Sequence, residues 1–147
     1  MSTAKATLFQ SDFSLQFTDA ALIREALCAS GVRSRDGNKN LAQIGDTGLQ
    51  FALQVEGRQR GAGRERINNI TSQVAGNAAL ARRGYALGLE KYIENNPSQG
   101  RYVPEKLMAA TMEAIVGAYF EDQGWDFEAL KRVLAVLRLG WPKGEEE

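Results

Sequence analysis

The stretch Leu41-Ala42-Gln43-Ile44-Gly45-Asp46-Thr47-Gly48-Leu49 decides the fold of this chain. It opens an apolar run that continues to Val55, yet it contains an acid and two glycines. A glycine inside a helix costs about 1 kcal/mol relative to alanine. Two glycines within one turn therefore predict that something packs close to this backbone. Asp46 lies among apolar neighbours, so its carboxylate is expected to face a cation or a hydrogen-bond donor.

The rest of the chain is patterned as helices joined by polar loops. Apolar residues recur at helical spacing near residues 18–29, 41–55, 66–83 and 105–123 and again after Asp126, which is expected to cap the last helix. Runs of alternating apolar and polar residues are missing, so the predicted class is all-α. We expect a flexible N-terminal arm at 1–11, a single domain at 12–140 and an acidic tail at 141–147.

Composition excludes several kinds of protein. The 147 residues include 18 acids and 18 bases, so any nucleic-acid surface must be a local patch. The sequence has no histidine, which excludes histidine catalysis and histidine-ligated zinc. Cys28 is the single cysteine, and its apolar helical setting predicts a core position. The absence of a run of roughly 20 apolar residues and of a secretory pattern favours an intracellular location.

Two acids stand in unusual helical surroundings. Ala42 precedes Asp46 by one turn, and Glu113 has Ala110 before it and Gly117 after it. If their helices cross, the two acids could share a divalent cation, and a magnesium site of this kind suits phosphodiester hydrolysis without histidine. They could instead pair with lysine or arginine inside a helical bundle. Spacing alone favours this second interpretation.

A basic segment follows the first acid. Residues 57–66 read Gly-Arg-Gln-Arg-Gly-Ala-Gly-Arg-Glu-Arg, and they combine flexible glycines with the planar donors of Arg58, Arg60, Arg64 and Arg66. Such a loop could grip phosphates, although exposed basic loops are common. Lys106 lies on the same helical stripe as Glu113, where it could orient a carboxylate, contact a nucleic-acid backbone or, equally, serve only as a surface residue.

Three motifs resemble the ribonuclease III family. Residues 41–49 resemble its signature, whose usual form is Glu-Arg-Leu-Glu-Phe-Leu-Gly-Asp-Ala-Val-Leu, and Lys106 to Tyr119 resembles its second acidic motif. Between them, residues 77–93 follow the family's Asn-x-x-Leu and Gly-Leu-x-x-Tyr-Ile pattern. The resemblance covers roughly Phe17 to Leu139, with the motifs in the expected order.

The resemblance implies a fold, a partner and a reaction. Family members are all-helical, dimerise through the signature helix and hold double-stranded RNA in the valley of the dimer, where each subunit cuts one strand at a site that uses Mg²⁺ (or Mn²⁺). It makes Asp46 and Glu113 the catalytic, metal-binding pair. It also predicts a dimer interface formed by Leu41, Ile44, Gly45, Gly48 and Leu49.

The chain departs from the family at the metal site. Four carboxylates build the usual site, but the signature glutamate falls on Ala42, the second-motif aspartate on Ala110 and the additional acid before the signature on Lys39. The Mini-III branch, which consists of the catalytic domain alone, looks similar in keeping chiefly the aspartate and the last glutamate. Like that branch, this chain is expected to lack a double-stranded-RNA-binding domain. Asp36 and Glu105 are further acids that could approach the site.

Three functions compete on these grounds. The persistence of Asp46 and Glu113 favours, by a small margin, a homodimeric magnesium-dependent endoribonuclease for double-stranded RNA. The alanines at positions 42 and 110 favour a non-catalytic relative that binds structured RNA, as ribosome-associated members of the fold do. A protein-interaction module that keeps only the dimerising helices is the third, and the balanced net charge is compatible with it.

Overall fold

The structure is a computed structural model, and it describes residues 2–143. Within that range the chain forms helices and turns without a strand, and an isolated bridge joins Cys28 to Glu94. The all-α prediction is confirmed. The helices are α1 (Ser2–Phe13), α2 (Ala20–Ala26), α3 (Lys39–Gln59), α4 (Arg64–Ala75), α5 (Asn77–Ala86), α6 (Glu105–Asp122) and α7 (Phe127–Val136), with short 3₁₀ turns η1 (Leu89–Tyr92) and η2 (Pro97–Gln99).

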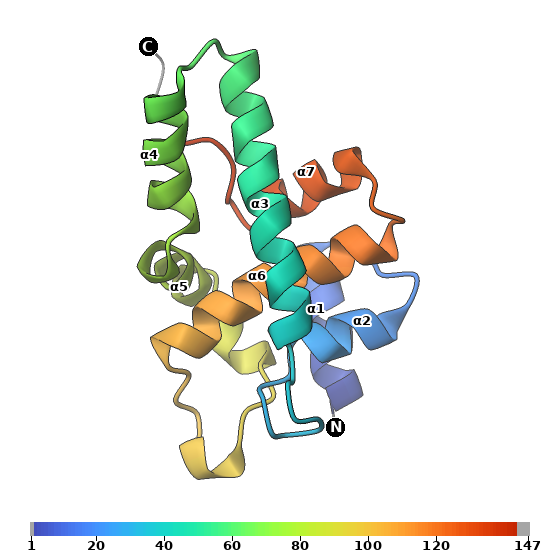
Figure 1. The fold of residues 1–147 in the computed structure, drawn as a ribbon. Coiled ribbons are helices and arrows are strands. Elements are labelled where there is room, and N and C mark those ends of the chain that lie inside the picture. Colours follow the sequence, from blue (N-terminus) through green and yellow to red (C-terminus); the bar gives the residue numbers. More distant parts are fainter. Residues whose placement is uncertain (1, 144–147) are drawn as a thin grey trace.

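Helix α6 is the centre of the fold. Nearly every residue from Met108 to Tyr119 is buried, and α2, α3, α5 and α7 all pack on it. The long helix α3 crosses α6 in its N-terminal half and then runs on beside α4 (Figure 1). The crossing is unusually close because a glycine from each helix, Gly45 and Gly117, faces the backbone of the other.

A buried polar side chain fixes the start of α3. Asn38 is almost fully buried, and its amide group donates to the carbonyl oxygen of Ala26 at 2.9 Å and to the hydroxyl of Thr111 at 3.1 Å. A buried amide without partners would be destabilising, so these bonds define where α3 begins relative to α2 and α6.

The predicted flexible arm at 1–11 is wrong, because helix α1 occupies this region and joins the core. Phe9 is fully buried, stacks on Phe13 with ring centroids 4.6 Å apart, and meets the edge of Tyr92 at 5.6 Å. The Tyr92 hydroxyl also donates a hydrogen bond to Asp12. These contacts with a residue about eighty positions away hold α1, whose own sequence lacks a strong apolar stripe.

Two predicted boundaries also change. The expected helix at 66–83 is two helices, because Gly76 takes an extended conformation (φ −67°, ψ 151°) between α4 and α5. At the C-terminal end, Trp141 is only 6% exposed, so the core continues past the predicted domain end at residue 140. The three glutamates of the predicted acidic tail lie outside the described residues.

The last helix begins as predicted. Asp126 accepts a hydrogen bond from the backbone N–H of Ala129 at 2.9 Å, the expected cap of α7. Among the helices that the structure describes, none is long and apolar enough to cross a membrane.

Candidate active site

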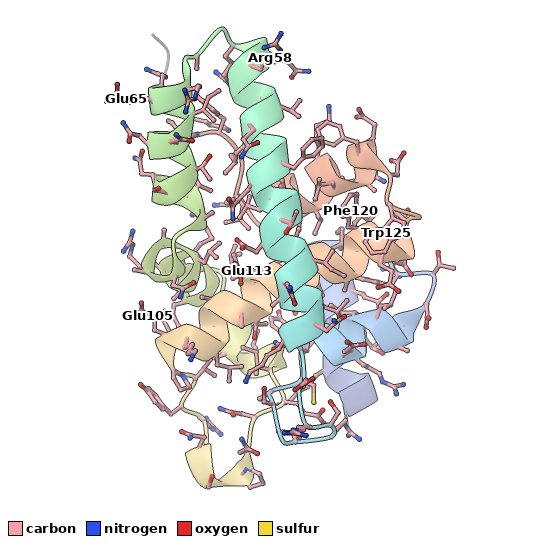
Figure 2. All side chains as sticks on the ribbon, viewed as in Figure 1. Arg58, Glu65, Glu105, Glu113, Phe120 and Trp125 are labelled. Carbon is pink, nitrogen blue, oxygen red and sulfur yellow. The ribbon has the colours of Figure 1, made fainter. Side chains whose placement is uncertain are left out.

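The crossing of α3 and α6 brings Asp46 and Glu113 together. Gly45 lies directly before Asp46, and its backbone touches the main chain of Glu113 itself. A side chain at position 45 would force the helices apart, so the close approach of the two acids depends on this glycine. The two carboxyl groups lie close enough to interact, so the helices that carry them meet at these residues. Figure 2 shows Glu113 on α6 beside the crossing.

The electrostatics of the pair favour one shared proton. Burial raises the pKa of Glu113 from 4.5 to about 8, and the negative charge of Asp46 and the hydrogen bond to Asp46 add to the effect. Two adjacent carboxylates cannot both ionise cheaply in a half-buried place. At neutral pH the Glu113 carboxyl therefore keeps its proton and donates it towards Asp46.

A third polar side chain completes the site, and the sequence reasoning missed it. Gln50 follows Asp46 by one helical turn, and its Nε2 donates to Asp46 Oδ1 at 3.0 Å. The four-residue spacing on α3 was the available signal, because it places both side chains on one face of the helix.

Ala42 and Ala110, where the resemblance expects acids, differ in burial. Ala42 is only 6% exposed and belongs to the core, while Ala110 is half-buried and packs against that core. Asp36 is exposed before α3, and Glu105 is exposed in the first turn of α6, about 12 Å along the helix axis from Glu113. In residues 2–143 no three acids or cysteines gather into one cluster, so these further acids do not join the pair.

The pair fits a magnesium ion that keeps most of its water. Mg²⁺ is usually held by one or two carboxylates, with water and phosphate oxygens completing the octahedron. The carboxyl groups of Asp46 and Glu113 lie side by side, and the pKa of Glu113 is raised there. A cation bound between the two groups would balance their negative charges in place of the proton. The donor set suits Mg²⁺ or Mn²⁺ and offers neither thiolate nor imidazole.

The arginines predicted to form a flexible loop lie mostly on helices. Arg58 is in the last turn of α3, Arg60 caps its end, and Arg64 and Arg66 begin α4. Arg60 pairs with Glu56 at 2.9 Å and lies over the Trp141 ring at 5.5 Å.

The basic residues stand apart from the acids. Arg58 follows Asp46 by twelve residues, about 18 Å along α3, and Figure 2 shows it at the far end of that helix from Glu113. Lys106 is exposed two turns before Glu113, about 10 Å along α6. Arg58 and Lys106 are therefore separated from the acidic pair along their own helices.

Most of the predicted dimer interface is buried inside one chain. Leu41 and Leu49 are core residues and Gly45 faces α6, so they cannot form the surface that meets a second copy. The sequence indicated close packing correctly but could not tell whether the neighbour was a partner or another helix of the same chain. Ile44 and Gly48 instead line an open groove of about 520 Å³ together with Asn40, Gln43, Thr47, Phe51, Phe120 and Trp125.

Comparison with known proteins agrees with this geometry. Residues of this chain align with ribonuclease 3 from Oleidesulfovibrio alaskensis at 28% identity over 141 residues, covering 89% of this chain and 61% of that protein. Ribonuclease 3 from Bordetella pertussis is 29% identical over 124 residues, covering 81% of this chain and 47% of that protein. The chain thus spans about half to three fifths of the length of these relatives. A search of protein-family models finds no match.

The fold has close counterparts among solved structures. The nuclease domain of ribonuclease III from Campylobacter jejuni superposes with a TM-score of 0.76 at 19% identity, covering 90% of this chain and 93% of that domain. That protein shows structural flexibility in a region involved in dimer formation. A second structure of the same domain gives a TM-score of 0.74 and covers 92% of both chains. In sequence the chain is similar to proteins named ribonuclease 3, and in fold it is similar to the nuclease domain of ribonuclease III.

Proposed function

We propose that this protein is a divalent-metal-dependent endoribonuclease that cuts double-stranded RNA. The observation that carries the proposal is the convergence of Asp46 and Glu113 at the α3–α6 crossing of a ribonuclease III fold. Paired carboxylates with a strongly raised pKa are typical of functional sites rather than of helix packing alone. The activity of the relatives named ribonuclease 3 supports the choice of reaction.

Asp46 and Glu113 would hold Mg²⁺ or Mn²⁺. A bound cation supplies positive charge at the scissile phosphate and lowers the pKa of the water that attacks it. The protein's part is to hold the two carboxyl groups together and to release the proton of Glu113 when the cation binds. Ala42 and Ala110 leave the remaining coordination to water and to RNA, so the cation should bind more weakly than in a site with four carboxylates.

The arginines at the α3–α4 turn would contact the RNA backbone away from the cut. Arg58 and Arg64 are exposed, and a separation of about 18 Å from Asp46 along α3 corresponds to several base pairs of duplex. Lys106 would contact phosphates nearer the acids. Recognition would rest on A-form shape and 2′-hydroxyl groups, because the deep major groove of RNA hides its base edges.

We also propose that the protein is a homodimer joined through the groove on α3. Phe51 is 53% exposed and Trp125 is 51% exposed, and both border this groove beside Ile44 and Gly48. Large apolar side chains that share an exposed groove mark an interaction surface. This interface uses the outer face of α3, and the buried residues Leu41, Gly45 and Leu49 would support it from inside.

A specific observation favours one alternative. Two usual ligand positions are alanine, and Ala42 is packed into the core, which suits a relative that binds structured RNA without cutting it. Such a protein would keep the arginines and the fold without binding a metal.

One assay separates the two functions. The parent, Asp46→Asn and Glu113→Gln are incubated with double-stranded RNA and Mg²⁺, with Asp36→Asn and Glu105→Gln as matched controls at exposed acids outside the pair. The enzyme is supported if the parent and both controls cut and the first two variants do not. Cleavage by Asp46→Asn and Glu113→Gln would contradict the proposed site. Salt-sensitive RNA binding by a parent that never cuts would establish the alternative.

A further inference from the structure

The carboxylate of Asp46 is held from two sides. Glu113 reaches it from α6, and Gln50 reaches it from the next turn of α3. A carboxylate cannot donate a hydrogen bond, so Gln50 must turn its NH₂ group towards Asp46 and its carbonyl oxygen away. Both side chains are half-buried, which limits competition from water.

The other neighbour of Asp46 on the same helical stripe offers nothing polar. Ala42 stands one turn before Asp46 and contributes only a methyl group to the core. The terminal torsion of an aspartate is soft and broad, so an unsupported carboxylate must be ordered when a cation binds. Gln50 is the α3 side chain that can supply this order in advance.

We propose that Gln50 is a positioning residue that holds the Asp46 carboxylate ready for a divalent cation at a site where Ala42 provides no second carboxylate. The inference rests on the proposed metal site and deepens it. Partners that hydrogen-bond to a metal ligand typically change metal affinity 10- to 100-fold when they are removed. If the hydrogen bond between Gln50 and Asp46 were only structural, its loss would lower the stability of the helix slightly and leave metal affinity unchanged.

The test compares Gln50→Met with Gln54→Met. Methionine keeps the length and unbranched shape of glutamine but has no donor, and Gln54 is the exposed glutamine one turn further along α3. Binding of Mn²⁺ to the protein without RNA is followed by loss of the electron paramagnetic resonance signal of the free ion. We expect Gln50→Met to bind Mn²⁺ about tenfold more weakly or worse, and Gln54→Met to match the parent.

Kinetics and thermal unfolding separate positioning from folding. For Gln50→Met we expect a lower kcat on double-stranded RNA at fixed Mg²⁺, an unchanged KM for RNA and an unchanged thermal midpoint in chelator. Equal Mn²⁺ affinity in parent and Gln50→Met would overturn the role of Gln50 while leaving the metal site standing. A parent that binds no Mn²⁺ would overturn the site and the inference together. If Gln50→Met fails to fold, Gln50→Ala is measured by the same criteria.

Discussion

Gly45 of α3 lies with its backbone against the carbonyl group of Glu113 of α6. A Cβ built at position 45 would come within 2.6 Å of the Glu113 carbonyl carbon, and closer still to its oxygen. Gly45, the residue before Asp46, therefore contacts the backbone of Glu113. The close contact between α3 and α6 thus also sets the positions of the two acids of the candidate site.

The first prediction concerns that contact. Gly45→Ala should destabilise the protein by about 2 kcal/mol or more, because main-chain atoms of α6 cannot move aside as a side chain would, and this outweighs the roughly 1 kcal/mol that alanine gains in helix propensity. The measurement is the free energy of unfolding in urea. Gly140→Ala is the control, since a Cβ there meets open space. Equal stability of the two variants would mean that the crossing is loose.

The second prediction is a dependence of stability on pH. The pKa of Glu113 is raised from 4.5 to about 8, so between these values the folded protein binds a proton that the unfolded chain has lost. The stability from this site is fully present below pH 4.5 and is lost as pH rises through about 8. In chelator, the parent should therefore lose more unfolding free energy than Glu113→Gln between about pH 5 and about pH 8. Identical losses would contradict the shared proton.

The third prediction follows from the same proton. A cation that binds Asp46 and Glu113 must displace it, so binding at neutral pH should release about one proton and affinity should rise with pH up to about 8. Calorimetric titration with Mn²⁺ in buffers of different ionisation enthalpy measures the released proton directly. Release of no proton would place the cation elsewhere, and Glu113→Gln should show neither the release nor the pH dependence.

The fourth prediction adds a third acid to the proposed metal site. Ala110 is half-buried one turn before Glu113, so Ala110→Asp adds a carboxylate on the side of α6 that carries the pair. Mn²⁺ should then bind roughly tenfold more tightly, which corresponds to about 1.4 kcal/mol of binding free energy. Ala135→Asp, at an exposed position of α7, should leave binding unchanged. Unchanged affinity in Ala110→Asp would show that position 110 does not face the cation.

The fifth prediction tests the apolar groove on α3. Phe51→Glu places a charge in the middle of this surface, and the protein should become a monomer in multi-angle light scattering, whereas the parent should have twice the 16.1 kDa mass of the chain. Tyr102→Glu, at a residue that is 65% exposed in the loop before α6, should keep the parent's mass. A monomeric parent would rule out the proposed dimer.

The sequence predicted most of the fold where local patterns are strong. The buried α6 and the Asp126 cap of α7 follow from apolar periodicity and capping chemistry. Helix α1 could not be predicted in this way, because it depends on the distant ring of Tyr92 packing against Phe9 and Phe13.

The candidate site was predictable in its pair of acids but incomplete in its neighbours. The glycines beside Asp46 indicated that something packs close to this backbone, and the structure shows that the neighbour is Glu113 of α6. Whether the helices of the two acids cross could not be told from the spacing. The glycines could not show whether the neighbour was another helix of the same chain or a helix of a second copy. Close backbone packing requires glycine in both cases. Gln50 escaped notice because a polar residue on a helix is ordinary until its partner is known.

Helix α3 serves three surfaces within a few turns. Gly45 and Leu49 face the core, and Ile44 and Phe51 face the open groove. Asp46 faces Glu113 and is hydrogen-bonded to Gln50. Residues three or four positions apart share a face of the helix, so a rotation or shift of α3 would move all three surfaces together. Better packing on one surface would therefore disturb the contacts of the other two. A substitution on one surface can nevertheless leave the other two in place, so the core, the groove and the acidic pair can be altered separately.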